Sequence, residues 1–181
     1  MVKFVDHLVG RLVTNIEQLG LQQKTIIIFT TDNGTARNIT GNRSGRPVRG
    51  GKGRLTETGM NVPFIVSQPG TIKENVTTDV LMDFTDLLPT FADLGGANIP
   101  NDLILDGHSI GGLLRGEKID ITRSWIMAMG GGVAKIDRNK VVPEKKYGDR
   151  VIRNKQFKLW VEDGKVTRFY DLKNDVVEKN N

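Results

Sequence analysis

Two kinds of hydrophobic periodicity mark the first third of the chain. Apolar residues recur at helical spacing over residues 2–19 and Gly20 follows them, which predicts an amphipathic helix that ends at this glycine and packs on a sheet. Residues 26–29 form an unbroken Ile-Ile-Ile-Phe run, which predicts a strand covered on both faces, as in a parallel α/β sheet. Residues 63–67 predict a second strand, which a Gln-Pro-Gly turn ends. We expect the two strands to be parallel.

A second, mainly helical segment is predicted over residues 79–94. Asp86 is a suitable N-cap residue, Pro89 falls in the first turn, where its missing N–H costs nothing, and two glycines at 95–96 end the helix. Asp106 and His108 follow. They could form a catalytic pair, but hydrogen bonding in an Asx turn explains them better.

From residue 123 the pattern changes to short strands separated by Gly, Asn and Asp. This pattern predicts a small antiparallel sheet with a hairpin turn at residues 162–165. Residues 130–147 predict an irregular excursion. The chain therefore divides into an α/β part, residues 1–120, and a small antiparallel β part, residues 121–181. The predicted strands are 125–129, 150–153, 157–161 and 166–170.

Composition narrows the class of protein only a little. The chain has 181 residues and no apolar run of the about 18 residues that a membrane span needs. It contains no cysteine, so no disulfide forms within it, but the redox compartment stays open. No signal peptide begins at Met1. The sequence therefore leaves the compartment and the oligomeric state unknown.

The net charge of +5 is concentrated in one loop, residues 35–61, because the other charges in the chain balance. This loop holds six glycines, a single acid, Glu57, and six basic residues: Arg37, Arg43, Arg46, Arg49, Lys52 and Arg54. It shows almost no apolar periodicity. Basic side chains and glycine amides gathered at one strand end predict a pocket for an anion such as phosphate or sulfate. The alternative is a solvated surface lid.

Two other interpretations of this loop fail. A nucleotide-binding P-loop requires glycine and Ser or Thr where the chain has Arg46 and Gly53. An RGG-like nucleic-acid tether requires aromatic residues for stacking, and residues 35–61 contain none. We therefore expect no nucleic-acid partner.

Asp32, Asn33 and Gly34 directly follow the first predicted strand. The carboxyl end of a parallel strand is where open α/β sheets bind ligands, and glycine allows the chain to turn away sharply. Carboxylate and amide oxygens suit a hard cation such as calcium or magnesium, and the amide adds no second negative charge. A simple Asp-Asn-Gly turn is the alternative.

These motifs resemble the carboxyl-terminal part of a sulfatase of the alkaline phosphatase superfamily. The resemblance rests on TTDNG after an apolar strand, then GGKG, ETG and VPFIVSQPG, and it extends to the ending with Arg153, Phe157-Lys158-Leu159 and YDL. It departs from the family where Glu57-Thr58-Gly59 replaces EGG and where Asn61 replaces the arginine of RVP. The resemblance implies an α/β fold with part of a mostly parallel sheet flanked by helices, amino-terminally truncated, before a small antiparallel subdomain.

The resemblance also implies the roles of site residues. Asp32 and Asn33 would ligate one divalent cation, usually calcium, and Lys52 would bind the sulfate of a sulfate-ester substrate and act in catalysis. His7 would be structural, because the catalytic histidines of the family lie farther upstream. The family is periplasmic, secreted or lysosomal. Its nucleophile, a formylglycine made from Cys or Ser in a C/S-x-P/A-x-R motif, would lie upstream, so the chain alone would be inactive.

Two missing features, cation ligands and neighbouring strands, agree with the expectation that part of the sulfatase lies upstream of this sequence. Calcium takes six to eight oxygens, more than Asp32 and Asn33 offer, and two strands are too few to cover a strand as apolar as residues 26–29. Two alternatives stay open: a related phosphatase, phosphodiesterase or phosphonate hydrolase, and a non-catalytic anion-binding module. The neutral amide of Asn33 favours a single calcium over the two transition metals of the related hydrolases.

Overall fold

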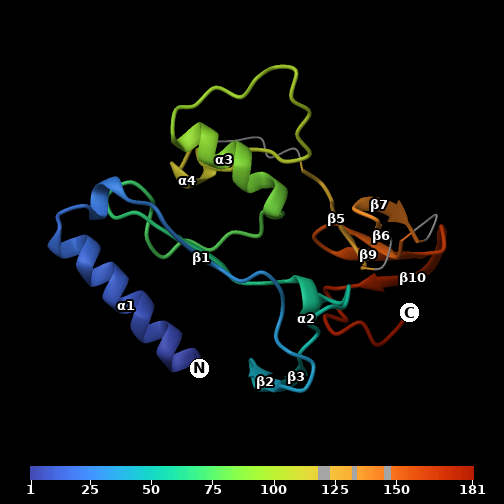
Figure 1. Ribbon diagram of the computed structural model, residues 1–181. Coiled ribbons are helices and arrows are strands. Elements are labelled where there is room, and N and C mark those ends of the chain that lie inside the picture. The colour runs from blue at the N-terminus through green and yellow to red at the C-terminus, as the bar shows by residue number, and fades with distance from the viewer. Residues whose placement is uncertain (118–122, 132–133, 145–147) are drawn as a thin grey trace. The chain divides into compact units, whose positions relative to one another are not determined.

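A computed structural model describes residues 1–117, 123–131, 134–144 and 148–181. The chain forms two compact units, each built from segments that are distant in the sequence (Figure 1). Unit 1 comprises Met1–Thr30, Phe64–Thr78 and Phe84–Ile121. Unit 2 comprises Thr31–Pro63, Asp79–Asp83 and Thr122–Asn181.

The amino-terminal helix, α1 (Val2–Gln18), is confirmed. Gly20 follows it with φ of 67°, a left-handed conformation that glycine adopts without strain. The short 3-10 helix η1 (Gln22–Lys24) comes next. No residue of α1 is buried, and Leu12 is 52% exposed, so the expected packing of its apolar stripe on the sheet is absent from the described structure. No helix in the described ranges is long and apolar enough to cross a membrane.

The first two strands of the sequence prediction exist, but their direction was wrong. β1 (Ile27–Thr30) and β4 (Phe64–Ser67) pair antiparallel, with Ile28 opposite Val66. All four residues of β1 are only half-buried. Among the described residues, β4 is the only strand paired with β1, and a two-stranded ribbon cannot cover an apolar strand on both faces.

The second helix is shorter than expected. η2 (Phe84–Asp86) leads into α3 (Leu87–Leu94), and residues 79–83 are not helical. Asp86 occupies the N-cap position, but its side chain makes no capping hydrogen bond. Its carboxylate instead accepts the backbone N–H of His108 at 2.8 Å, which fixes the segment that leads to α4 (Gly111–Leu114).

Unit 2 contains the predicted antiparallel sheet, in the order β10-β9-β8-β5. The orange-to-red part of Figure 1 shows these strands, and the hairpin turn between β9 and β10 lies where the sequence placed it. Their core joins the sheet to the basic loop, because Leu55 packs with Val151, Trp160, Tyr170 and Leu172. The strands are β5 (Ile126–Met129), β8 (Arg150–Arg153), β9 (Phe157–Glu162) and β10 (Lys165–Asp171).

Two segments expected to lack regular structure form hairpins. In the basic loop, β2 (Thr40–Arg43) pairs with β3 (Arg46–Arg49), and α2 (Glu57–Met60) follows. In the predicted excursion, β6 (Ala134–Asp137) pairs with β7 (Lys140–Pro143). In both hairpins the two turn residues have positive φ, which matches the twist of paired strands. Residues 132–133 and 145–147 of the excursion lie outside the described residues.

Candidate functional site

The predicted cation ligands lie in a turn directly after β1. The Asn33 side-chain amide donates to Oδ2 of Asp32, and Thr31 Oγ1 donates to the Asn33 carbonyl at 3.2 Å. The Gly34 N–H donates to the Gly59 carbonyl at 2.9 Å. The ends of the two ligand side chains therefore meet at one point, and the turn is hydrogen-bonded to α2.

This pair fits part of a hard-cation site. Both side chains offer oxygen donors, and the Asn33 amide is assigned with its nitrogen toward Asp32. Rotation of the amide by about 180° would place two oxygens together, an arrangement that a cation between them stabilises. Among the described residues no three His, Asp or Glu side chains gather at one point. Asp32 and Asn33 thus offer donors for part of a cation site, and their role as ligands stays a prediction.

Lys52 lies where the basic loop returns to this turn. Its backbone N–H donates to the Thr35 carbonyl at 3.0 Å, and the Gly50 N–H donates to the Ile39 carbonyl at 2.9 Å. The Lys52 side chain is exposed and makes no hydrogen bond or ion pair with any described residue. The structure therefore brings the Lys52 backbone next to Thr35, but no contact joins its amine to Asp32 or Asn33.

The cations of the basic loop lack carboxylate partners. None of the six forms an ion pair with another residue in the part of the chain that the structure describes. Arg43 and Arg46 stand opposite each other in the β2–β3 register, where like charges repel. The Arg49 Nε donates to the Arg37 carbonyl at 2.8 Å. This uncompensated positive charge is available to an anionic ligand.

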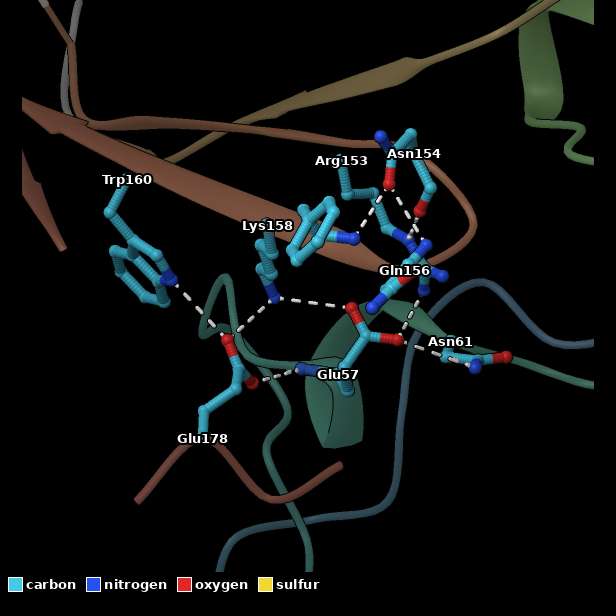
Figure 2. Close-up of polar contacts among 9 residues, drawn as sticks. Glu57, Asn61, Arg153, Asn154, Gln156, Lys158, Trp160 and Glu178 are labelled. Carbon is cyan, nitrogen blue, oxygen red and sulfur yellow. Dashed lines mark hydrogen bonds and ion pairs between the residues drawn. The ribbon is translucent and has the colours of Figure 1, made fainter. Parts of the chain in front are cut away.

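A buried charge cluster holds α2 (Figure 2). Lys158, which is fully buried, places its Nζ 3.3 Å from Oε1 of Glu57 and 2.9 Å from Oε1 of Glu178. Arg153 Nη1 lies 2.5 Å from Oε2 of Glu57. Trp160 Nε1 donates to Glu178 at 3.3 Å. Two carboxylates thus face two cations from the neighbouring strands β8 and β9.

Sequence reasoning assigned no role to this cluster. Glu57 was only the single acid of a loop expected to form an anion pocket or, as the alternative, a solvated lid, whereas it is 4% exposed. Lys158 of β9 entered the sequence analysis only as one of the residues that resemble the ending of a sulfatase. The available signal was Glu57 as the single acid of a strongly basic loop, together with Lys158 two positions before Trp160 in a predicted strand. That signal does not show which charges pair.

Solved structures place the chain in the class of alkaline phosphatase-like proteins. A protein called BT4656, in complex with its substrate D-glucosamine-2-N,6-O-disulfate, matches 99% of this chain and 34% of its own, with TM-score 0.71 and 26% identity. A phosphonate monoester hydrolase from Silicibacter pomeroyi matches 94% of this chain and 33% of its own, with TM-score 0.70 and 22% identity, which shows the fold alone. The predicted fold class is confirmed.

Family models give the finer assignment. The model described as Sulfatase matches residues 1–97, and the model described as N-sulphoglucosamine sulphohydrolase, C-terminal, matches residues 51–181. The chain therefore belongs to the sulfatase family, as the motifs indicated. Arylsulfatase A from Homo sapiens is 45% identical over 114 residues. This match covers 62% of the chain but only 22% of the relative.

Proposed function

We propose that this chain supplies Asp32, Asn33 and Lys52 to a calcium-dependent enzyme that hydrolyses sulfate esters. The observation that carries the proposal is the closure of the basic loop by the 3.0 Å hydrogen bond from the Lys52 N–H to Thr35, two residues after Asn33. Membership of the sulfatase family supports the reaction class, and the cations without carboxylate partners support an anionic substrate.

Each residue has a distinct role in this proposal. Asp32 and Asn33 hold the cation, which when bound would act as a Lewis acid on a sulfuryl oxygen. The Lys52 ammonium group donates a hydrogen bond to a sulfate oxygen and stabilises the negative charge that develops as the alcohol leaves. The alcohol part of the substrate stays open.

The nucleophile in this proposal lies outside the chain. The 181 residues contain no cysteine and no C/S-x-P/A-x-R motif that could yield a formylglycine. We therefore assign the formylglycine to sequence upstream of residue 1. The 181-residue chain alone is expected to turn over no aryl sulfate, and such turnover by the purified chain would contradict this assignment.

The test is an assay of the complete protein, this chain joined to its upstream part, on an aryl sulfate. We expect hydrolysis that a chelator stops and added Ca²⁺ restores. Lys52→Ala should lower kcat/KM by about 10²–10³-fold, roughly 2.7–4 kcal/mol, as when one oxyanion donor is lost. Lys165→Ala, at an exposed hairpin position, is the control and should change kcat/KM less than about twofold.

Two outcomes would contradict the proposal. Turnover of phosphate or phosphonate monoesters in preference to the sulfate would favour the related hydrolases. Sulfate binding without turnover of any ester would favour an anion-binding module. An unchanged kcat/KM in Lys52→Ala would remove the catalytic role of this residue while leaving the reaction class intact.

A further inference from the structure

Three segments of unit 2 pack backbone against backbone at glycines. A Cβ on Gly34 would lie 1.9 Å from the Thr58 carbonyl oxygen, and one on Gly59 would lie 2.4 Å from the Gly51 carbonyl oxygen. A Cβ on Gly51 would lie 2.7 Å from the Gly59 nitrogen. The Asp32–Gly34 turn, the loop that carries Lys52 and α2 are therefore in direct backbone contact. A shift of α2 must move both other segments.

α2 cannot hold this place by itself. It is a four-residue helix, and so short a helix is unstable without tertiary contacts. Two side chains before and within it provide those contacts. Leu55 is buried in the core of unit 2, and Glu57 is buried in the charge cluster. The apolar contact of Leu55 is non-directional, whereas the ionic contacts of Glu57 have defined geometry.

Glu57 is held at both its side chain and its backbone (Figure 2). Each carboxylate oxygen contacts a different cation, Oε1 the Nζ of Lys158 at 3.3 Å and Oε2 the Nη1 of Arg153 at 2.5 Å. Its own N–H, at the first position of α2, donates to Oε2 of Glu178 at 2.7 Å. Glu178 in turn contacts Lys158 at 2.9 Å. These contacts fix the position of α2 and its rotation about its axis.

We propose that Glu57 is a positioning residue, which acts through Lys158 and Arg153 to set the place of Lys52 relative to Asp32 and Asn33. The inference rests on the proposed function of those three residues. Buried ion pairs often add little net stability compared with apolar packing, so the cluster is assigned to the geometry that it imposes on α2. Misplacement of a substrate-binding group by about 1 Å can cost about 10²-fold in rate.

The experiment compares Glu57→Gln with Ile152→Ala in the complete protein, each at the same interval below its own Tm. Ile152 is half-buried and lies on the face of β8 opposite to Val151, so its truncation destabilises the unit without removing a charge or a core neighbour of Leu55. In Glu57→Gln we expect kcat to fall about tenfold to a hundredfold with little change in KM. Hydrogen exchange of the Gly34 and Lys52 amides should become at least about tenfold faster. Ile152→Ala should leave both quantities within about twofold.

Several outcomes decide the inference. An unchanged kcat and unchanged amide exchange in a folded Glu57→Gln protein would overturn it. An equal loss in Ile152→Ala would also overturn it, because general destabilisation would then suffice. If Glu57→Gln does not fold, Arg153→Gln, at the more exposed side of the cluster, replaces it with the same two readouts and the same criteria. Amide exchange needs no turnover, so it tests the positioning role even if the complete protein hydrolyses no sulfate ester.

Discussion

Two groups of cations in unit 2 differ in their burial and in their carboxylate partners. The basic loop presents exposed cations for which the described residues offer no carboxylate. The charge cluster around α2 buries Lys158 completely and gives it two carboxylate partners, Glu57 and Glu178. An exposed unpaired cation can exchange water for an anionic ligand, whereas a buried paired cation cannot leave its partners without a large desolvation cost. The comparison teaches that burial and carboxylate partners separate cations that are free to meet a ligand from cations that hold the protein's own segments together.

The buried group should give the largest effect on stability. Lys158→Met leaves Glu57 and Glu178 buried and facing each other without the ammonium group between them. We expect the free energy of unfolding to fall by about 3–5 kcal/mol, the range for breaking a buried pair. Urea unfolding monitored by circular dichroism measures this change. Lys165→Met is the exposed control, expected within about 0.5 kcal/mol of the parent, and similar values for both variants would show that burial does not distinguish the two groups.

The glycine contacts that join the two groups should give the next largest effect. In Gly34→Ala the new methyl group meets a backbone carbonyl of α2 at 1.9 Å, so the backbone must shift. Overpacking of this kind costs about 1–3 kcal/mol, which thermal or urea unfolding measures. Gly41→Ala is the matched control in β2, because a Cβ there meets nothing within 4 Å. If Gly34→Ala were as mild as the control, the segments would not be rigidly joined.

A charge change among the exposed cations of the basic loop should raise the free energy of unfolding instead of lowering it. Arg43→Glu replaces a repulsive pair with Arg46 by an attractive one, so the free energy of unfolding should rise by about 0.2–1 kcal/mol. Sulfate affinity, measured by titration, should fall because the net positive charge of the loop falls by two. Arg43→Gln should give intermediate values. Loss of stability in Arg43→Glu would show that this arginine has a structural partner.

An exposed ion pair in unit 1 gives the smallest expected effect. The Ser109 hydroxyl and the Arg115 guanidinium each donate a hydrogen bond to the Asp93 carboxylate. These two contacts, that of Ser109 being the stronger cause, hold the pKa of the Asp93 carboxyl below its ordinary value. Because the pKa of Asp93 is lower in the folded than in the unfolded protein, its contacts stabilise the fold fully above about pH 4. This stabilisation is lost as the pH falls through the folded pKa of Asp93. Ser109→Ala should move the Asp93 pKa upward in an NMR titration. The free energy of unfolding of Ser109→Ala should approach that of the parent protein as the pH falls. A gap that widens in acid would contradict the lowered pKa of Asp93.

The sequence determined the type and approximate place of the two longer helices and of six strands. Helical spacing located α1 to within a residue at each end, and short runs separated by Gly, Asn and Asp located the four strands of the antiparallel sheet. The motif residues Asp32, Asn33 and Lys52 were chosen from residue chemistry and resemblance, and their roles stay predictions. The β2–β3 and β6–β7 hairpins were not predicted because their strands are only four residues long, and because Ser44 and Arg138 are unusual residues at positive φ.

Tertiary structure alone decided which strands pair and which charges are buried. Local periodicity does not encode direction, so β1 and β4 looked parallel although they pair antiparallel. The alternation in β9 would place Phe157 and Leu159 inward, yet the face with Lys158 and Trp160 is the buried one. A lysine is tolerated there only because carboxylates meet it, and Glu57 lies 101 positions away in the chain. A partner so distant in sequence is visible only once the chain has folded.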